Sequence, residues 1–260
     1  MMTAATDTLL ELDRISLSFG GVKAVNDISF SVKRGEIFAL IGPNGAGKSS
    51  ILNVINGVYR ADSGMVSFAG VRHTRLAPEA GARLGIARTF QNIALFKGMS
   101  VLDNVLSGRY LKTRRGWLQQ LLSLPAAVRE QEAHRRRAEE IIDFLHLQPW
   151  RHTIVSKLPY GIQKRVELGR ALASEPTLLL LDEPMAGMNL EEKRDMSAFI
   201  LDVNREFKTT VVLIEHDLGV VMDISDHVVV LDYGRKIGDG APADVRSQPE
   251  VIAAYIGLSH

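Results

Sequence analysis

Cysteine is the one residue type missing from this chain of 260 residues. Without it the protein has no disulfide, no thiolate metal ligand and no cysteine nucleophile. An excess of charge of one sign is missing too, because 31 Lys and Arg residues stand against 30 Asp and Glu, for a net charge of +1. General nucleic-acid-binding proteins are usually distinctly basic, so we expect no nucleic acid among the partners.

Long apolar segments are also absent. The apolar runs are short, such as the four leucines at 178–181, whereas a membrane-spanning helix needs about 18 apolar residues. Residues 1–14 lack the basic start and the apolar core of a secretory signal. Gly and Pro, at 22 and 9 residues, are near average usage and exclude a low-complexity chain. We therefore expect a soluble, cytoplasmic protein.

The order of predicted elements favours an α/β fold. Alternating apolar residues within 9–35 predict strands of an N-terminal antiparallel part, and residues 37–41 (IFALI) predict a strand buried on both faces. A helix is expected from about Lys48 to Asn56, and a helical piece at 78–84 lies among short strands within 65–90. Further along, helices and strands alternate, which is typical of a mainly parallel sheet; the helices are expected at 164–174 and 190–206, and the strands at 177–182, 210–214 and 227–232.

Residues from about 100 to 155 have a different texture, mostly helical in pattern, and we interpret them as an inserted helical subdomain. Basic clusters occur at 109–115, next to Trp117, and at 135–137. Such clusters bind anionic lipid head groups with about 1 kcal/mol per charge. The alternative, which we favour, is a solvated helix face balanced by nearby acids at Glu130, Glu132, Glu139 and Glu140.

The strongest chemical signal is an octapeptide that fits the phosphate-loop pattern G-x-x-x-x-G-K-[ST] at every position: Gly42, Pro43, Asn44, Gly45, Ala46, Gly47, Lys48 and Ser49. It lies between a predicted strand and a predicted helix, where backbone N–H groups and the helix start attract phosphate. Lys48 supplies a charge for the β- and γ-phosphates, and the Ser49 hydroxyl can ligate Mg²⁺. With Ser50, these residues predict a nucleoside triphosphate site; an ordinary glycine-rich turn is the alternative.

Two carboxylates, Asp182 and Glu183, follow the four leucines. In open α/β sheets, ligands bind at the carboxyl ends of strands. We expect Asp182 to hold the Mg²⁺ shell and Glu183 to accept a proton from the attacking water. A strand that merely ends in two solvated acids is the alternative, and the phosphate loop argues against it.

Four more segments carry a family resemblance. Residues 158–165 (LPYGIQKR) precede Asp182, Gln91 follows the Arg-Thr-Phe at 88–90, His216 lies within LIEHD at 213–217, and Phe19 precedes the phosphate loop. In this order and spacing, over nearly its whole length, the chain resembles an ABC (ATP-binding cassette) ATPase. The resemblance implies a P-loop NTPase fold with a parallel-sheet core, an N-terminal antiparallel β subdomain and an inserted α-helical subdomain.

The resemblance also implies roles for single residues. Phe19 would stack on adenine, Gln91 would meet Mg²⁺ and the lytic water and sense a membrane partner, and His216 would contact the γ-phosphate and hold the water with Glu183. Simpler roles are open for each: a core strand residue for Phe19, a polar loop residue for Gln91, and a structural histidine for His216.

The chain departs from the family in the signature loop. Pro159 replaces the serine that donates a hydroxyl to the γ-phosphate across a dimer, Tyr160 replaces the first glycine, and Ile162 replaces the glutamine. Gly161 and the start of the following helix remain, so Pro159, Tyr160 and Gly161 are expected to meet phosphate through the backbone. Asn189 stands where many relatives have Asp, and its amide is expected to hydrogen-bond in the D-loop.

Several of these details resemble one branch, the ATP-binding subunits of branched-chain amino acid importers. They are the PYG of the signature, residues 186–189 (AGMN), Glu215-His216-Asp217, residues 88–92 (RTFQN) and the tail at 249–257 (PEVIAAYIG). The helical insert at 109–132 is similar to that of the larger of the two ATPases in those systems. Urea or amide importers and the lipopolysaccharide-export ATPase carry similar sequences and stay open, and a soluble ABC protein outside transport is a further alternative.

The resemblance divides the chain into one ABC ATPase domain, with 1–90 and 164–240 as the nucleotide-binding core, about 91–163 as the helical subdomain and 241–260 as a C-terminal tail. Its implied cofactors are ATP and Mg²⁺. Its implied partners are a second cassette, identical or paralogous, transmembrane permease subunits and, indirectly, an exported solute-binding protein. The implied location is the inner face of the cytoplasmic membrane, with the permease docked against Phe90, Leu95, Phe96 and Met99; ordinary packing of those four is the alternative.

Overall fold

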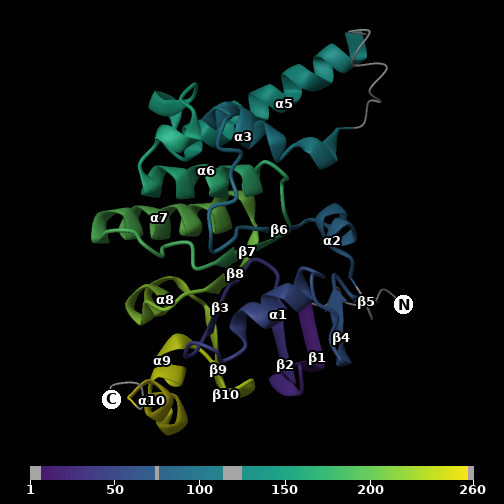
Figure 1. The fold of residues 1–260 in the computed structure, drawn as a ribbon, viewed down its shortest axis with the longest axis vertical. Coiled ribbons are helices and arrows are strands. Elements are labelled where there is room, and N and C mark those ends of the chain that lie inside the picture. The colour runs from purple at the N-terminus through teal and green to yellow at the C-terminus, as the bar shows by residue number, and fades with distance from the viewer. Residues whose placement is uncertain (1–6, 74–75, 114–124, 257–260) are drawn as a thin grey trace. The chain divides into compact units, whose positions relative to one another are not determined.

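The computed structural model describes residues 7–73, 76–113 and 125–256, which form two compact units (Figure 1). The first unit contains the described residues of Met1–Arg88, Thr177–Pro184 and Ile200–His260, and the second contains those of Thr89–Pro176 and Met185–Phe199. The second unit therefore reaches beyond the insert of about 91–163 that the sequence suggests. It does so because the helix after the signature residues packs on the other helices of the insert.

The N-terminal part of the first unit is an antiparallel sheet, as expected. Its strands are β1 (Thr8–Phe19), β2 (Val22–Lys33), β4 (Ser63–Phe68) and β5 (Val71–His73), in the order β2-β1-β4-β5. The short strands expected within 9–35 are two strands of 12 residues each. Register shifts along the β1–β2 pair explain why their alternation is imperfect in the sequence.

The second sheet of this unit contains the strands that end at the phosphate loop and at Asp182. Its order is β10-β9-β3-β8-β7-β6, with the antiparallel β10 at one edge. The strands are β3 (Ile37–Ile41), β6 (Ile86–Arg88), β7 (Leu178–Asp182), β8 (Thr210–Ile214), β9 (His227–Asp232) and β10 (Arg235–Gly240). Every residue of β3, β7 and β8 is buried, as expected for parallel strands covered on both faces.

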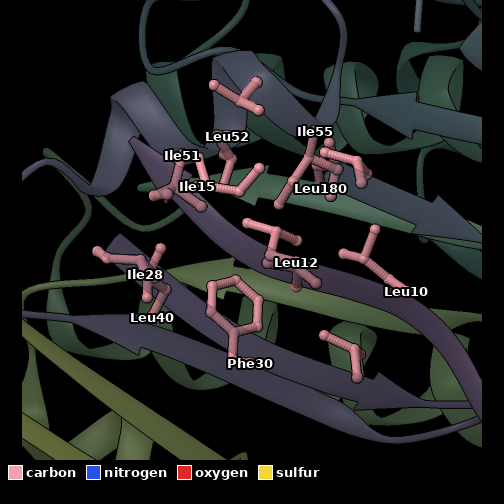
Figure 2. Close-up of a cluster of buried hydrophobic side chains, with 14 of the residues drawn as sticks. Leu10, Leu12, Ile15, Ile28, Phe30, Leu40, Ile51, Leu52, Ile55 and Leu180 are labelled. Carbon is pink, nitrogen blue, oxygen red and sulfur yellow. The ribbon is translucent and has the colours of Figure 1, made fainter. Parts of the chain in front are cut away.

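Alternate residues of β3 enter two different apolar clusters. Phe38 and Leu40 belong to a cluster shared with the antiparallel sheet and with α1 (Lys48–Ile55), which contributes Ile51, Leu52 and Ile55 (Figure 2). Ala39 and Ile41 belong to a second cluster under the C-terminal helices. These helices are α8 (Leu218–Ile224), α9 (Pro242–Arg246) and α10 (Pro249–Ile256), the last two gathered against β9 and β10 in Figure 1. The sheet is thus fixed from both faces, and α2 (Pro78–Leu84) precedes its edge strand β6.

The described part of the second unit is helical, as the pattern between 100 and 155 predicts. It comprises α3 (Val101–Ser107), η1 (Tyr110–Lys112), α5 (Pro125–Phe144), η2 (Gln148–Trp150), η3 (Val155–Lys157), α6 (Tyr160–Leu172) and the part of α7 (Leu190–Phe207) up to Phe199. No helix within the described residues has the length and apolarity that a bilayer span requires.

Several side chains of the basic clusters form ion pairs with acids. Arg137 contacts Glu140 at 2.7 Å, and Arg109 contacts Glu175 at 3.0 Å. Arg135 lies 4.0 Å from Glu139 on the same face of α5. Glu139 and Glu140 thus balance part of the cluster at 135–137, as the solvated helix face predicts, and Arg114, Arg115 and Trp117 lie outside the described residues.

Candidate nucleotide-binding site

The phosphate loop connects the end of β3 to the start of α1, and two of its glycines have no substitute. Gly42 has φ 146°, and a Cβ there would lie 2.0 Å from the Leu231 carbonyl oxygen. Gly47 has φ 101°, and its Cβ would lie 2.4 Å from the Ala24 carbonyl oxygen. Both distances are far shorter than a van der Waals contact. The backbones of β2 and β9 therefore leave no room for a side chain at these two positions of the loop. Asn44 and Gly45, at the tip, are exposed.

Lys48 is buried, with 5% of its surface exposed. Its Nζ donates to the carbonyl oxygens of Gly42 at 2.7 Å and Pro43 at 2.8 Å. Burial lowers the pKa of Lys48, while the charges of Glu183 and Asp182 act in the opposite direction. The structure therefore brings the predicted lysine and the two predicted carboxylates into one electrostatic site, with Ser49 and Ser50 in the first turn of the same helix.

Asp182 ends β7 and is held by a residue that the sequence analysis did not assign a role. Arg88, at the end of the neighbouring strand β6, donates to Asp182 Oδ2 at 2.7 Å and to Asn53 Oδ1 at 2.6 Å. Both side chains of the ion pair are buried, with 7% and 5% exposed. The other oxygen, Asp182 Oδ1, is buried without a hydrogen-bond partner in the described part of the chain. A buried oxygen of this kind suits a metal ion or its water.

Glu183 leaves the strand with a left-handed backbone, φ 49°, and its N–H donates to the Ile214 carbonyl at 2.9 Å. Its Oε1 lies 2.6 Å from His216 Nε2. The side chain of Glu183 is 13% exposed and that of His216 is 42% exposed. The two residues follow adjacent parallel strands, and this adjacency is what brings together groups 33 positions apart.

Phe19 ends β1 and is 44% exposed, so it is not a core strand residue. Its ring meets that of Tyr59 edge-on, with 5.1 Å between centroids. Tyr59, which the sequence analysis missed, is itself 38% exposed. Two aromatic faces are therefore available to a planar ligand in the first unit.

The remaining predicted site residues belong to the second unit, and one expectation there is wrong. α6 begins at Tyr160 rather than at 164, so Tyr160 and Gly161 form the first helical turn, and Pro159 is its N-cap. Gly161 lies against α7, because a Cβ there would be 2.3 Å from Glu192 Oε1. Gln91 is exposed, in a loop whose carbonyl at that position accepts a hydrogen bond from Lys164 Nζ at 2.9 Å.

Asn189 uses its side-chain oxygen to cap a helix. Its Oδ1 accepts from Glu192 N at 2.9 Å, while Glu192 Oε2 accepts from Asn189 N at 3.0 Å. This reciprocal capping box starts α7. The amide that we expected to hydrogen-bond in the D-loop is thus engaged within its own chain. Of the four expected docking residues, Phe90, Phe96 and Met99 are exposed and Leu95 is buried.

A phosphate loop on one parallel strand and an acidic pair two strands away form the site of a P-loop nucleotide-binding protein, and this chain is one. Comparison with known proteins makes the class narrower. The family model described as "ABC transporter" matches residues 25–186, and that described as "Branched-chain amino acid ATP-binding cassette transporter" matches residues 235–260. The chain belongs to the ABC transporter family, as the resemblance of its motifs indicates.

Individual relatives are similar in sequence to this chain over nearly their full length. The high-affinity branched-chain amino acid transport ATP-binding protein BraF of Pseudomonas aeruginosa is 36% identical over 249 residues, which cover 96% of this chain and 98% of BraF. The corresponding protein LivG of Escherichia coli K12 is 35% identical with the same coverage. Among solved structures, the ADP conformation of MJ1267, an ATP-binding cassette of an ABC transporter, has a TM-score of 0.84 at 34% identity, covering 97% of this chain and 100% of that one.

Proposed function

We propose that this chain is the ATP-hydrolysing subunit of an importer for branched-chain or related small neutral amino acids. The observation that supports hydrolysis best is the 2.6 Å contact between Glu183 and His216 at the carboxyl ends of β7 and β8. The names of BraF and LivG, and the C-terminal family match at 235–260, support the choice of solute.

The residues of the site fit a Mg²⁺ ion bound together with the nucleotide. No three His, Asp or Glu side chains gather into a metal cluster among the described residues. Mg²⁺ in such sites takes one or two protein ligands and oxygens of the substrate phosphates. Asp182 Oδ1, buried and without a hydrogen-bond partner in the described residues, is the protein oxygen that remains for it, with the Ser49 hydroxyl. When bound, the ion neutralises charge on the phosphates, and Gln91 is proposed to approach the same shell.

Different residues of this chain bind the phosphates, accept the proton of water and stack on the base. The Lys48 ammonium, now bonded to two loop carbonyls, turns to the β- and γ-phosphates when ATP enters. Glu183 accepts the proton of the attacking water, and His216 fixes the orientation of that carboxylate. Phe19, with Tyr59, stacks on the base. No covalent intermediate is needed, because positioning and charge neutralisation supply the catalysis.

The assembly that we propose contains two cassettes, this chain paired with a copy or a paralogue. Residues 42–49 of one cassette and Pro159, Tyr160 and Gly161 of the other enclose each ATP. The exposed Phe90, Phe96 and Met99 receive a permease subunit on the inner face of the cytoplasmic membrane, and an exported solute-binding protein delivers the solute. The division of the chain into a core of 1–90 and 164–240, an insert of about 91–163 and a tail of 241–260 remains part of this proposal.

Two substitutions in the purified chain test the hydrolytic site. Glu183→Gln is expected to keep ATP binding and to slow turnover by about 10²–10⁴-fold, since it removes a general base. Lys48→Ala is expected to weaken ATP binding and turnover together. Glu191→Gln, at the exposed start of α7, is the matched control and should leave both unchanged. Unchanged turnover in Glu183→Gln would remove Glu183 from this role.

The solute is tested separately in the assembled transporter. The chain is copurified with candidate permease subunits and reconstituted in vesicles with a solute-binding protein. Leucine, isoleucine or valine should stimulate ATP turnover and accumulate inside. Stimulation by urea or an amide instead, or extraction of lipopolysaccharide, would assign the chain to another transporter of the same family.

A further inference from the structure

Residues 89–96, around Gln91, belong to no helix or strand, and side chains of α6 hold their backbone. Lys164 Nζ donates to the carbonyl oxygens of Gln91 at 2.9 Å and Phe90 at 3.4 Å. Glu167 Oε1 accepts from the N–H groups of Phe90 at 3.4 Å and Ala94 at 3.3 Å. One cation and one anion, a single turn apart on α6, thus bind carbonyls and amides of the same short segment.

Both members of the pair are almost fully buried. Lys164 Nζ and Glu167 Oε2 are 3.8 Å apart, and each side chain is 2% exposed. One turn further along α6, Arg170 donates to the Ala94 carbonyl, and its guanidinium lies 5.9 Å from the centre of the Phe96 ring. The three charged side chains occur at spacings of three residues, so they form one face of the helix toward residues 90–96.

Burying such a pair is costly, because both ions lose their water and an apolar pair of similar volume is often as stable or more so. Stability alone therefore does not explain it. The contacts of the pair give a reason: an apolar pair cannot donate to Gln91 and Phe90 carbonyls or accept from Phe90 and Ala94 amides. The same helix begins at Tyr160, within the signature residues, so one rigid element connects these residues to the Gln91 loop.

We propose that Lys164 and Glu167 are positioning residues that hold the Gln91 loop to α6, so that the loop and the signature turn move as one body during ATP turnover. This inference rests on the proposed function, because it gives Gln91 a part in hydrolysis. Neither residue touches the nucleotide in this proposal. Their effect on turnover is through the backbone of residues 90–94.

The test replaces the buried pair by an apolar pair, Lys164→Met with Glu167→Leu, in the full-length chain. The matched control is Arg165→Met with Asp195→Leu. It removes the ion pair between Arg165, next to Lys164 on α6, and Asp195 on α7, and this pair does not contact the loop. Hydrogen exchange of the Phe90 and Ala94 amides is measured in both variants, with KM for ATP and kcat. A third variant, Lys164→Arg with Glu167 intact, keeps a donor for the two carbonyls.

In the apolar variant the Phe90 and Ala94 amides should exchange at least about tenfold faster, and kcat should fall about tenfold or more with KM within about twofold. Lys164→Arg should keep kcat close to that of the parent chain, and the Arg165→Met with Asp195→Leu control should match the parent chain in kcat and in amide exchange. Unchanged amide exchange or unchanged kcat in the apolar variant, with normal folding, would overturn the inference. If it does not fold, Lys164→Met with Glu167→Gln leaves no buried charge at these two positions and still removes the donor to the Gln91 and Phe90 carbonyls, and unchanged kcat in that variant would also overturn the inference. A parent chain without turnover would instead count against the proposed function.

Discussion

Replacing Arg88 by methionine tests the geometry around Asp182 most directly. The Arg88–Asp182 contact is 2.7 Å long, and its two side chains are only 7% and 5% exposed. Methionine fills a similar volume but leaves the Asp182 carboxylate buried without its cation. Removing one partner of a buried ion pair typically costs about 3–5 kcal/mol of unfolding free energy. Against a total of about 5–15 kcal/mol for a domain, such a loss is large.

Urea unfolding, followed by circular dichroism, measures this loss. Arg14→Met is the control, since Arg14 forms an exposed pair with Asp13, with side chains 76% and 56% exposed, and such pairs contribute at most about 1 kcal/mol. Arg88→Lys should lower the unfolding free energy less than Arg88→Met does, because an ammonium keeps the positive charge beside Asp182. It should still lower it, because an ammonium cannot contact Asn53 and Asp182 in the same fixed geometry. An Arg88→Met chain as stable as Arg14→Met would refute the reasoning.

Three further substitutions probe other parts of the first unit. Gly42→Ala, whose Cβ would lie 2.0 Å from the Leu231 carbonyl oxygen, should abolish the thermal shift that ATP produces, whereas Gly98→Ala, with nothing within 4 Å, should retain it. Tyr255→Phe should lower the unfolding free energy by about 1 kcal/mol in urea, because the Gly42 amide bonds to this hydroxyl, whose pKa burial raises to about 12; an unchanged midpoint would contradict that bond. Burial alone would raise the pKa of Asp239, but hydrogen bonds from Lys236 and His227 hold it below its usual value. The ionised Asp239 carboxylate therefore contributes to the unfolding free energy above about pH 4, and this contribution is lost as the pH falls through its folded pKa. The unfolding free energy of Asp239→Asn should accordingly depend less on pH below about pH 4.

Elements with strong local patterns were predictable from the sequence. The buried strands β3 and β8 and the short helix α2 have the predicted bounds, because continuous apolar runs and a proline at the first helical position are local signals. The start of α6 was not, since Gly161 and a proline disfavour helix interiors and suggest a loop. In the structure the proline is outside the helix as its N-cap, and the glycine gives room to Glu192.

Buried charged residues were the second feature that could not be predicted from the sequence. The phosphate loop was found by its spacing, and Asp182 and Glu183 by their place directly after an apolar strand, so both signals lie in neighbouring residues of the chain. Arg88 and Asp182 are 94 residues apart, and Lys164 and Gln91 are 73 apart. Which Lys or Arg becomes buried depends on the sheet order and on the helix that covers it, and neither follows from local periodicity.

The departure at Pro159 has a consistent explanation in the start of α6. A serine at an N-cap usually accepts a hydrogen bond from an amide of the first turn. Pro159 offers no side-chain acceptor, and α6 has no side-chain cap. Since the first amides of a helix have no intrahelical partner, those of Tyr160, Gly161 and Ile162 keep their capacity to donate. Under the proposed function, the loss of the serine hydroxyl is therefore offset by first-turn amides that no cap occupies, and the γ-phosphate is met through the backbone.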